Sequence, residues 1–135
     1  MVDRQGTPLA VVLTAANRND GKVLEEALDA IPPVSNGRPG RPRRRPEKLH
    51  ADKGYDYAFC RQALRVRGIL ARIARRGIES KERLGRYRWV VERTLAWLNQ
   101  FRRLKVRYER RSDIHLAFLL LGCAMICLRQ IHRFC

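Results

Sequence analysis

The stretch from Arg88 to Tyr108 reads RWVVERTLAWLNQFRRLKVRY, and the interpretation of the rest of the chain starts from it. Its mostly apolar positions recur at the three- and four-residue spacing that lines one face of a helix. These positions are Val90, Thr94, Trp97, Phe101, Leu104 and Tyr108, with Val91, Leu95 and Leu98 widening the face. The pattern predicts a helix that is buried along this face.

Arg88 and Glu92 stand one turn apart on another face of the same helix, which Ala96, Asn99 and Arg103 continue. A lone carboxylate therefore faces outward from a basic surface. One interpretation is a solvent-exposed ion pair, which contributes only a few tenths of a kcal/mol. The other interpretation makes Glu92 a metal ligand, and it requires a second carboxylate elsewhere in the chain.

A candidate for that second carboxylate is Asp52, in the segment Leu49 to Asp56, LHADKGYD. The segment predicts a short strand that ends at Asp52 and breaks at Gly54. An Asp at the end of a strand, beside a glycine turn, projects from the edge of a sheet where a ligand can reach it.

Two blocks, HADKGYD and the later ARRGIESKERLGRYRWVVERTLAWLNQFRRLKVRYER, closely resemble the catalytic half of bacterial insertion-sequence DDE transposases. The similarity is to the subgroup with a compact Asp-to-Glu interval. It covers nearly the whole chain, and two separated blocks in the right order are more specific than one short motif. The resemblance implies an α/β, ribonuclease H-like fold that lacks its first strand, with a mixed sheet covered by helices, as one partial catalytic domain over residues 1–135.

The resemblance also implies the chemistry of the site. In this family an Asp, a second Asp and a Glu hold two divalent cations, usually Mg²⁺ and alternatively Mn²⁺. Asp52 and Glu92 would be two of these ligands, because hard cations prefer carboxylate oxygen and two of them support phosphodiester hydrolysis and strand transfer. The first Asp is expected upstream of Met1, so we expect little or no strand transfer by this chain alone.

The family pattern around the Glu is Tyr, two residues, Arg, three residues, Glu, six residues, then Lys or Arg. The chain keeps Arg88 but has Gly85 at the Tyr position and Asn99 at the basic position. Arg102 or Arg103 is then the candidate for the accessory DNA contact. Arg88 is assigned either to a phosphate or to orienting Glu92.

Charge favours DNA as the partner. Lys and Arg outnumber Asp and Glu by 29 to 13, which gives a net charge of +16. Such a surplus favours a polyanion, because each neutralised phosphate releases counterions. No lipidation motif or separate basic amphipathic anchor indicates a membrane partner. The four cysteines form no C-x-x-C pair and are interpreted as buried thiols. Because the sequence also shows no signal peptide, the expected location is the bacterial cytoplasm, at the nucleoid.

Residues 38–48, RPGRPRRRPEK, form a basic loop in which three prolines exclude regular helix. A solvated linker is one interpretation; phosphate contact is favoured, because arginine donates bidentately and the loop leads into the strand that bears Asp52. The candidate DNA-binding residues that complete the set are Arg43, Arg44, Arg45, Lys53, Arg75 and Arg76.

The first half of the chain predicts a turn at Val2 to Pro8, formed by Asp3, and then a strand from Leu9 to Thr14. A hairpin needs a strand on each side of its turn, and almost no residues precede this turn. The start at Met1 is therefore expected to fall inside a secondary-structure element. Asp20 is expected to cap a helix from about Lys22 to Ile31.

The second half predicts a helix from Ala58 to Val66, ended by Gly68, with its inward side chains at Phe59, Ala63, Leu64 and Val66. A short strand over residues 69–74 and a polar connection over residues 77–85 follow. A last helix over residues 114–133 is expected to cover the sheet, because its apolar run over residues 116–128 is too short to span a bilayer.

Two alternatives remain open beside a transposase fragment. One is a non-catalytic protein that binds nucleic acid, either a decaying remnant or a regulator of the full enzyme. The other is an RNA-binding protein of ribosomal type. A homo-oligomer, or complementation by an upstream reading frame, is also left open.

Overall fold

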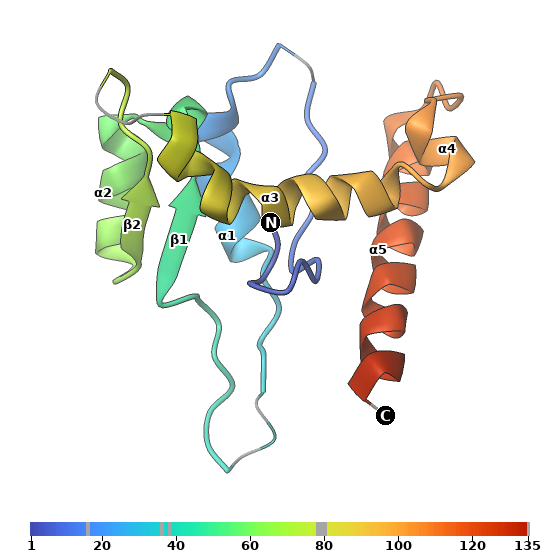
Figure 1. The fold of residues 1–135 in the computed structure, drawn as a ribbon, viewed down its shortest axis with the longest axis horizontal. Helices are drawn as coiled ribbons and strands as arrows, with labels where there is room; N and C mark the ends of the chain where they lie inside the picture. The colour runs from blue at the N-terminus through green and yellow to red at the C-terminus, as the bar shows by residue number, and fades with distance from the viewer. Residues whose placement is uncertain (16, 36, 38, 78–80, 135) are drawn as a thin grey trace. The chain divides into compact units, whose positions relative to one another are not determined.

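The computed structural model describes the backbone of residues 1–15, 17–35, 37, 39–77 and 81–134, and the side chains of these except residues 81–88, 133 and 134. The chain forms two compact units, one of Met1–Leu13 with Trp89–Cys135 and one of Thr14–Arg88 (Figure 1).

The unit Thr14–Arg88 is built on two parallel strands. Strand β1 (Lys48–Ala51) pairs with β2 (Leu70–Ile73), with Leu49 opposite Ala71. Parallel neighbours require a crossover connection, and helix α2 (Ala58–Val66) provides it, lying beside β2 in Figure 1. The mixed sheet expected from the sequence is not present among the described residues, whose antiparallel pairing is limited to isolated bridges at Val2 with Pro8 and Val34 with Arg43.

The first helical segment consists of a 3-10 turn, η1 (Asp20–Val23), followed by helix α1 (Leu24–Asp29). Asn19 caps it, because its side-chain oxygen accepts a hydrogen bond from the Gly21 amide at 2.8 Å. The prediction that Asp20 would be the cap is therefore wrong by one residue.

Helix α2 has the predicted bounds, and Gly68, with φ 67°, follows its end. Its buried side chains are Cys60, Ala63 and Leu64. Phe59 and Val66, which were predicted to point inward, are exposed, Val66 by 78%. At 100° per residue, positions 60, 63 and 64 share one face of the helix and the other two do not.

In the other unit, the predicted turn at the start of the chain is confirmed, and Asp3 forms it. The Asp3 carboxylate accepts hydrogen bonds from the amides of Gln5 and Thr7, each at 2.8 Å. The strand predicted from Leu9 to Thr14 does not form. Only Met1 and Val2 precede the turn, so pairing is limited to the Val2 to Pro8 bridge and the hydrogen bonds of Met1 with Leu9 and Ala10.

Helix α3 (Lys81–Leu98) begins and ends earlier than the sequence indicates. It occupies half of the expected polar connection, of which residues 78–80 lie outside the described part. After Leu98 the chain bends, and a single turn of helix, α4 (Arg102–Lys105), follows. Thr94 and Leu98 are buried as predicted, whereas Val91, Leu95 and Tyr108 are exposed, so the buried face is narrower than predicted.

Helix α5 (Ser112–Phe134) packs on the bend between α3 and α4. The contact is close at Gly122, where an added Cβ would lie 2.8 Å from Leu104 Cδ1 and 3.1 Å from Leu98 Cδ2. The core here consists of Leu98, Cys123 and Ile126, with partly buried neighbours Val11, Trp97, Leu104 and Leu119. The prediction that α5 covers the sheet stays a prediction, because the two strands belong to the other unit.

Helix α5 also exceeds the apolar run counted from the sequence. Its segment Ser112–His132 is 21 residues long and is apolar enough, by length and composition alone, to cross a membrane. Core helices of soluble proteins pass the same test.

Candidate functional site

Asp52 directly follows β1, one residue beyond the strand end at which the sequence predicted it. It caps a short 3-10 turn, η2 (Lys53–Tyr55), by accepting a hydrogen bond from the Gly54 amide to Oδ1 at 2.9 Å. The turn engages one of the two carboxylate oxygens, and the side chain is exposed. A carboxylate in this position is accessible to a ligand.

A second carboxylate, Asp56, fixes the end of that turn. Its Oδ1 accepts from Arg61 Nη2 at 2.6 Å and Nε at 3.2 Å, and its Oδ2 accepts from the Arg76 amide at 2.9 Å. The Arg76 amide and the Arg61 guanidinium hold the pKa of the Asp56 carboxyl below its ordinary value. Since Arg61 also donates to the Ile73 carbonyl, Asp56 ties the segment after β1 to the end of β2.

Arg76, predicted to contact DNA, takes part in the same network. Its Nε donates to the Lys53 carbonyl at 3.1 Å, and its guanidinium lies 4.7 Å from the centre of the Tyr57 ring. The hydrogen bond with Arg76, followed by that with Asn19, lowers the pKa of the Tyr57 hydroxyl. Arg76 is therefore positioned to hold the turn that follows Asp52.

Asp20 is close to the same site. Tyr55 is half-buried, and desolvation raises its pKa, with further increases from the charges of Asp20 and Asp52. The turns η1 and η2 pack together, which brings both carboxylates near this phenol. From the sequence Asp20 was predicted only as a helix cap, and no motif spacing connects it to Asp52.

Glu92 lies on α3 in the other unit, and its side chain is exposed. The two residues after it attach the helix to the N-terminal turn. Thr94 Oγ1 donates to the Gly6 carbonyl at 2.8 Å, and Arg93 Nη2 donates to the Gln5 carbonyl.

The Arg93 guanidinium lies between two indole rings, 4.4 Å from the centre of Trp89 and 4.8 Å from that of Trp97. Such cation–π contacts restrain the side chain. These Arg93 contacts were not predicted from the sequence, although Trp89 and Trp97 stand four residues before and four residues after Arg93.

Asp52 and Glu92 belong to different units of the structure. Both supply the carboxylate oxygens that Mg²⁺ and Mn²⁺ prefer. Within the described ranges, no group of three or more His, Cys, Asp or Glu side chains could hold a metal ion. The carboxylates of Asp52 and Glu92 therefore fit Mg²⁺ or Mn²⁺ chemically. The described side chains do not form a complete ligand set for either ion.

The basic loop presents Arg43, Arg44 and Arg45 to solvent. Arg43 forms an ion pair with Glu47, and Arg45 Nη1 donates to the Arg67 carbonyl at 2.7 Å. Arg75 and Lys53 flank the Asp56 network, Arg75 exposed and Lys53 half-buried. These contacts lie on the surface of the protein and do not involve a phosphate. Phosphate binding by the loop therefore stays a prediction.

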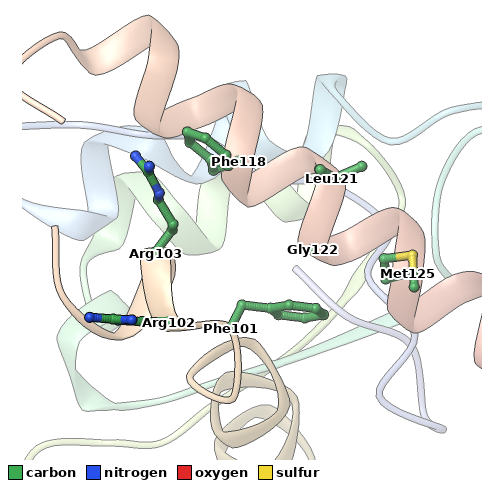
Figure 2. A pocket seen from close by; sticks show the side chains of 7 residues that line it. All are labelled: Phe101, Arg102, Arg103, Phe118, Leu121, Gly122 and Met125. Atoms are coloured by element: carbon green, nitrogen blue, oxygen red, sulfur yellow. The ribbon is translucent and has the colours of Figure 1, made fainter. Parts of the chain in front are cut away.

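Arg102 and Arg103 are exposed on α4 and border an apolar pocket of about 270 Å³ (Figure 2). Arg103 donates to Glu109 Oε1 at 2.6 Å and lies 5.3 Å from the centre of the Phe118 ring. The pocket residues on α5 are Phe118, Leu121, Gly122 and Met125. Arg88 belongs to α3, but its side chain lies outside the described residues.

Cys60 and Cys123 are buried free thiols, as predicted, and burial raises the pKa of both. Cys127 is half-buried. Cys135 lies outside the described part of the chain.

Comparison with known proteins identifies the family. A family model described as "Transposase DDE domain" matches residues 1–128. A curated relative, the putative transposase for insertion sequence element IS402 of Burkholderia cepacia, is 54% identical over 133 residues, which cover 98% of this chain and 63% of the relative. No solved structure matches. The chain spans less than two thirds of the length of that relative, and it belongs to the transposase DDE domain family.

Proposed function

We propose that this chain contributes two of the three acidic residues of a DDE transposase active site, with Asp52 as the second Asp and Glu92 as the Glu. The observation that carries the proposal is the placement of Asp52, exposed at the end of a parallel strand and fixed by the Gly54 amide. In α/β folds, ligands bind at such strand ends. The proposal includes one ribonuclease H-like domain over residues 1–135, in which the two carboxylates converge.

In this proposal, Asp52 and Glu92 would hold Mg²⁺ or Mn²⁺, which would supply the Lewis-acid chemistry of phosphodiester hydrolysis and strand transfer. Asp56, Arg61 and Arg76 keep the Asp52 turn in position. Thr94 and Arg93 keep the Glu92 helix attached to the N-terminal turn. The triad's first Asp is not assigned to any residue here.

DNA is the proposed substrate, and the net charge of +16 supports it. The loop arginines Arg43, Arg44 and Arg45, with Lys53 and Arg75, would contact phosphates near Asp52. Arg88, Arg102 and Arg103 would do so near Glu92, and Arg76 would contribute charge beside the turn that it holds. A protein acting on insertion-sequence ends would work in the bacterial cytoplasm, at the nucleoid.

The second candidate is a DNA-binding regulator without catalysis. DNA binding without catalysis needs only a basic surface, and the exposed loop arginines Arg43, Arg44 and Arg45 supply one.

An experiment with labelled insertion-sequence ends in Mg²⁺ or Mn²⁺ separates the two functions. The proposal predicts weak, metal-dependent nicking that Asp52→Asn and Glu92→Gln each abolish. Asp113→Asn and Glu26→Gln, exposed acids on α5 and α1, are the matched controls and should have no effect. Binding without nicking, unchanged by all four substitutions, would favour the regulator instead.

A further inference from the structure

The loop between α1 and β1 forms an arm that extends away from the helices and strands of its own unit (Figure 1). We define the arm as residues 34–45, and its described residues are all exposed. One backbone pair joins its two sides: the amides and carbonyls of Val34 and Arg43 exchange hydrogen bonds of 2.8 and 2.9 Å. Between these two residues, the described part of the arm forms no further backbone pair. The arm therefore ends in a single unpaired stretch of chain.

This stretch contains the tripeptide Gly-Arg-Pro twice in succession, at residues 37–39 and 40–42. The second copy lies wholly within the described part of the chain. Gly40 has φ 139°, which glycine adopts readily, and a Cβ added there would meet no atom within 4 Å. Pro42 disfavours helical backbone at Arg41 and so favours an extended chain. Arg41 is therefore a long cationic side chain on a thin, extended strand.

The arginines of the arm differ in their contacts. Arg43 forms an ion pair with Glu47, and Arg45 Nη1 donates to the Arg67 carbonyl at 2.7 Å, so both side chains hold the base of the arm. Arg41 has no hydrogen bond or ion pair with the residues that the structure describes. The other unit carries ten Lys and Arg against four Asp and Glu, so it offers this guanidinium little opposite charge. A polyanion outside the chain is the better partner.

We propose that the arm binds in the minor groove of A·T-rich DNA, with the Arg41 guanidinium inserted into the groove. The inference rests on DNA as the partner, as in the proposed function, and adds the groove and the base composition. The major groove admits a helix or a two-stranded ribbon, whereas the minor groove is only about 6 Å wide. The single strand from Gly40 to Pro42 suits the narrower groove, as other extended arms do.

The base preference follows from the chemistry of the groove. Tracts of A·T pairs narrow the minor groove and concentrate its negative potential, which attracts an inserted arginine. A G·C pair instead places the guanine amino group in the groove. Arginine suits this site better than lysine, because its guanidinium is more weakly hydrated and loses less on entering a narrow groove. Phosphate contacts from the rest of the arm would carry no sequence information, so Arg41 supplies the preference.

Fluorescence anisotropy of labelled duplexes with the purified full chain, in EDTA, tests the proposal. A duplex with a central A·T tract should bind at least about 10-fold more tightly than a G·C duplex of equal length. Replacing guanine by inosine removes the amino group from the minor groove and should restore tight binding. Replacing adenine by 2,6-diaminopurine adds that group and should abolish the preference. Both replacements leave the major groove unchanged, so they distinguish the two grooves.

Variants test the role of Arg41. Arg41→Ala should reduce the preference for A·T to less than about 2-fold, and Arg41→Lys should lose most of it while keeping the affinity for the G·C duplex. Arg65→Ala is the matched control, because it removes an exposed arginine of α2 in the same unit. It should leave the preference unchanged, and far-UV circular dichroism verifies that all three variants fold.

Equal affinity for the A·T and G·C duplexes, a preference that inosine does not transfer, or a preference that Arg41→Ala retains would each overturn the inference. None of these results bears on metal-dependent nicking, because EDTA removes the divalent cations and the binding assay does not depend on Asp52 or Glu92. A chain that binds no duplex at all would overturn the inference and, with it, DNA as the proposed substrate.

Discussion

Substituting Thr94 by Val tests the attachment of the Glu92 helix to the N-terminal turn. Thr94 is 2% exposed, and its hydroxyl donates to the Gly6 carbonyl at 2.8 Å in a buried contact. Val has nearly the same volume and a similar helix propensity, so packing is retained and the donor is lost. The Gly6 carbonyl then has no partner in the interior, which costs about 1–3 kcal/mol.

Urea unfolding followed by tryptophan fluorescence measures this destabilisation in the correct unit. The chain has two tryptophans, and both Trp89 and Trp97 lie in the unit that contains Thr94. Thr94→Ser keeps the donor and removes one methyl group, which costs about 1 kcal/mol. We expect Thr94→Val to lower the free energy of unfolding at least as much as Thr94→Ser.

If packing alone mattered, Thr94→Val would have almost no effect and Thr94→Ser would cost more. A free energy of unfolding for Thr94→Val within about 0.5 kcal/mol of the wild type, the usual range for innocuous surface changes, would refute the role of this hydrogen bond.

Three other predictions follow from the site and the core. Because the folded-state pKa of Asp56 is lowered, its carboxylate stabilises the fold above its unfolded pKa near 3.8, and this stabilisation disappears as the pH falls through the lower folded value. Asp56→Asn should therefore be less stable than wild type at pH 7, and its free energy of unfolding should fall less between neutral and acidic pH. Unfolding monitored by circular dichroism measures both effects. The same pH dependence in the variant and the wild type would contradict this prediction. Leu64→Ala, at a fully buried site, should cost about 2–5 kcal/mol in denaturant unfolding, whereas Val66→Ala on the same helix should cost less than about 0.5 kcal/mol; similar costs would show that α2 packs differently. Replacing Arg43, Arg44 and Arg45 by Ala should reduce the slope of log DNA affinity against log salt by about 0.9 for each phosphate that the loop no longer neutralises, and an unchanged slope would make the loop a solvated linker.

The sequence predicted best those helices, strands and turns whose bounds are set by residues close together in the chain. The bounds of α2 were predicted correctly and the end of β1 to within one residue, because the apolar residues there are bounded by Gly54 and Gly68. The turn at Asp3 was predicted for a similar reason, since its side chain bonds the backbone two and four residues later. These features depend on neighbours in the chain, and periodicity detects them.

The bend after Leu98 was missed because the apolar spacing continues through it. Leu98, Phe101 and Leu104 lie on both sides of the bend, yet all three approach Gly122 of α5. Their spacing therefore reflects packing against the same helix, α5, and does not show that they belong to one continuous helix. A pattern within one segment cannot distinguish the two cases without the helix that it packs against.

The candidate site was predicted only where a motif marks it. Asp52 was found at a strand end, whereas the Asp56, Arg61 and Arg76 network joins residues up to twenty positions apart and has no periodic signature. The approach of Asp20 to Tyr55 is equally nonlocal, because it depends on how η1 and η2 pack. Such contacts come from the tertiary fold, which local patterns do not specify.

The convergence of Asp52 and Glu92 on one metal site is the central claim, and metal-directed cleavage of the polypeptide tests it most directly. With Fe²⁺ in place of Mg²⁺, ascorbate and peroxide generate radicals that cut the backbone next to the bound ion. The account predicts cuts within a few residues of both Asp52 and Glu92, suppressed by excess Mg²⁺ and abolished at both positions in Asp52→Asn and in Glu92→Gln. Cuts near only one of the two residues, or cuts that persist at one when the other is substituted, would contradict it.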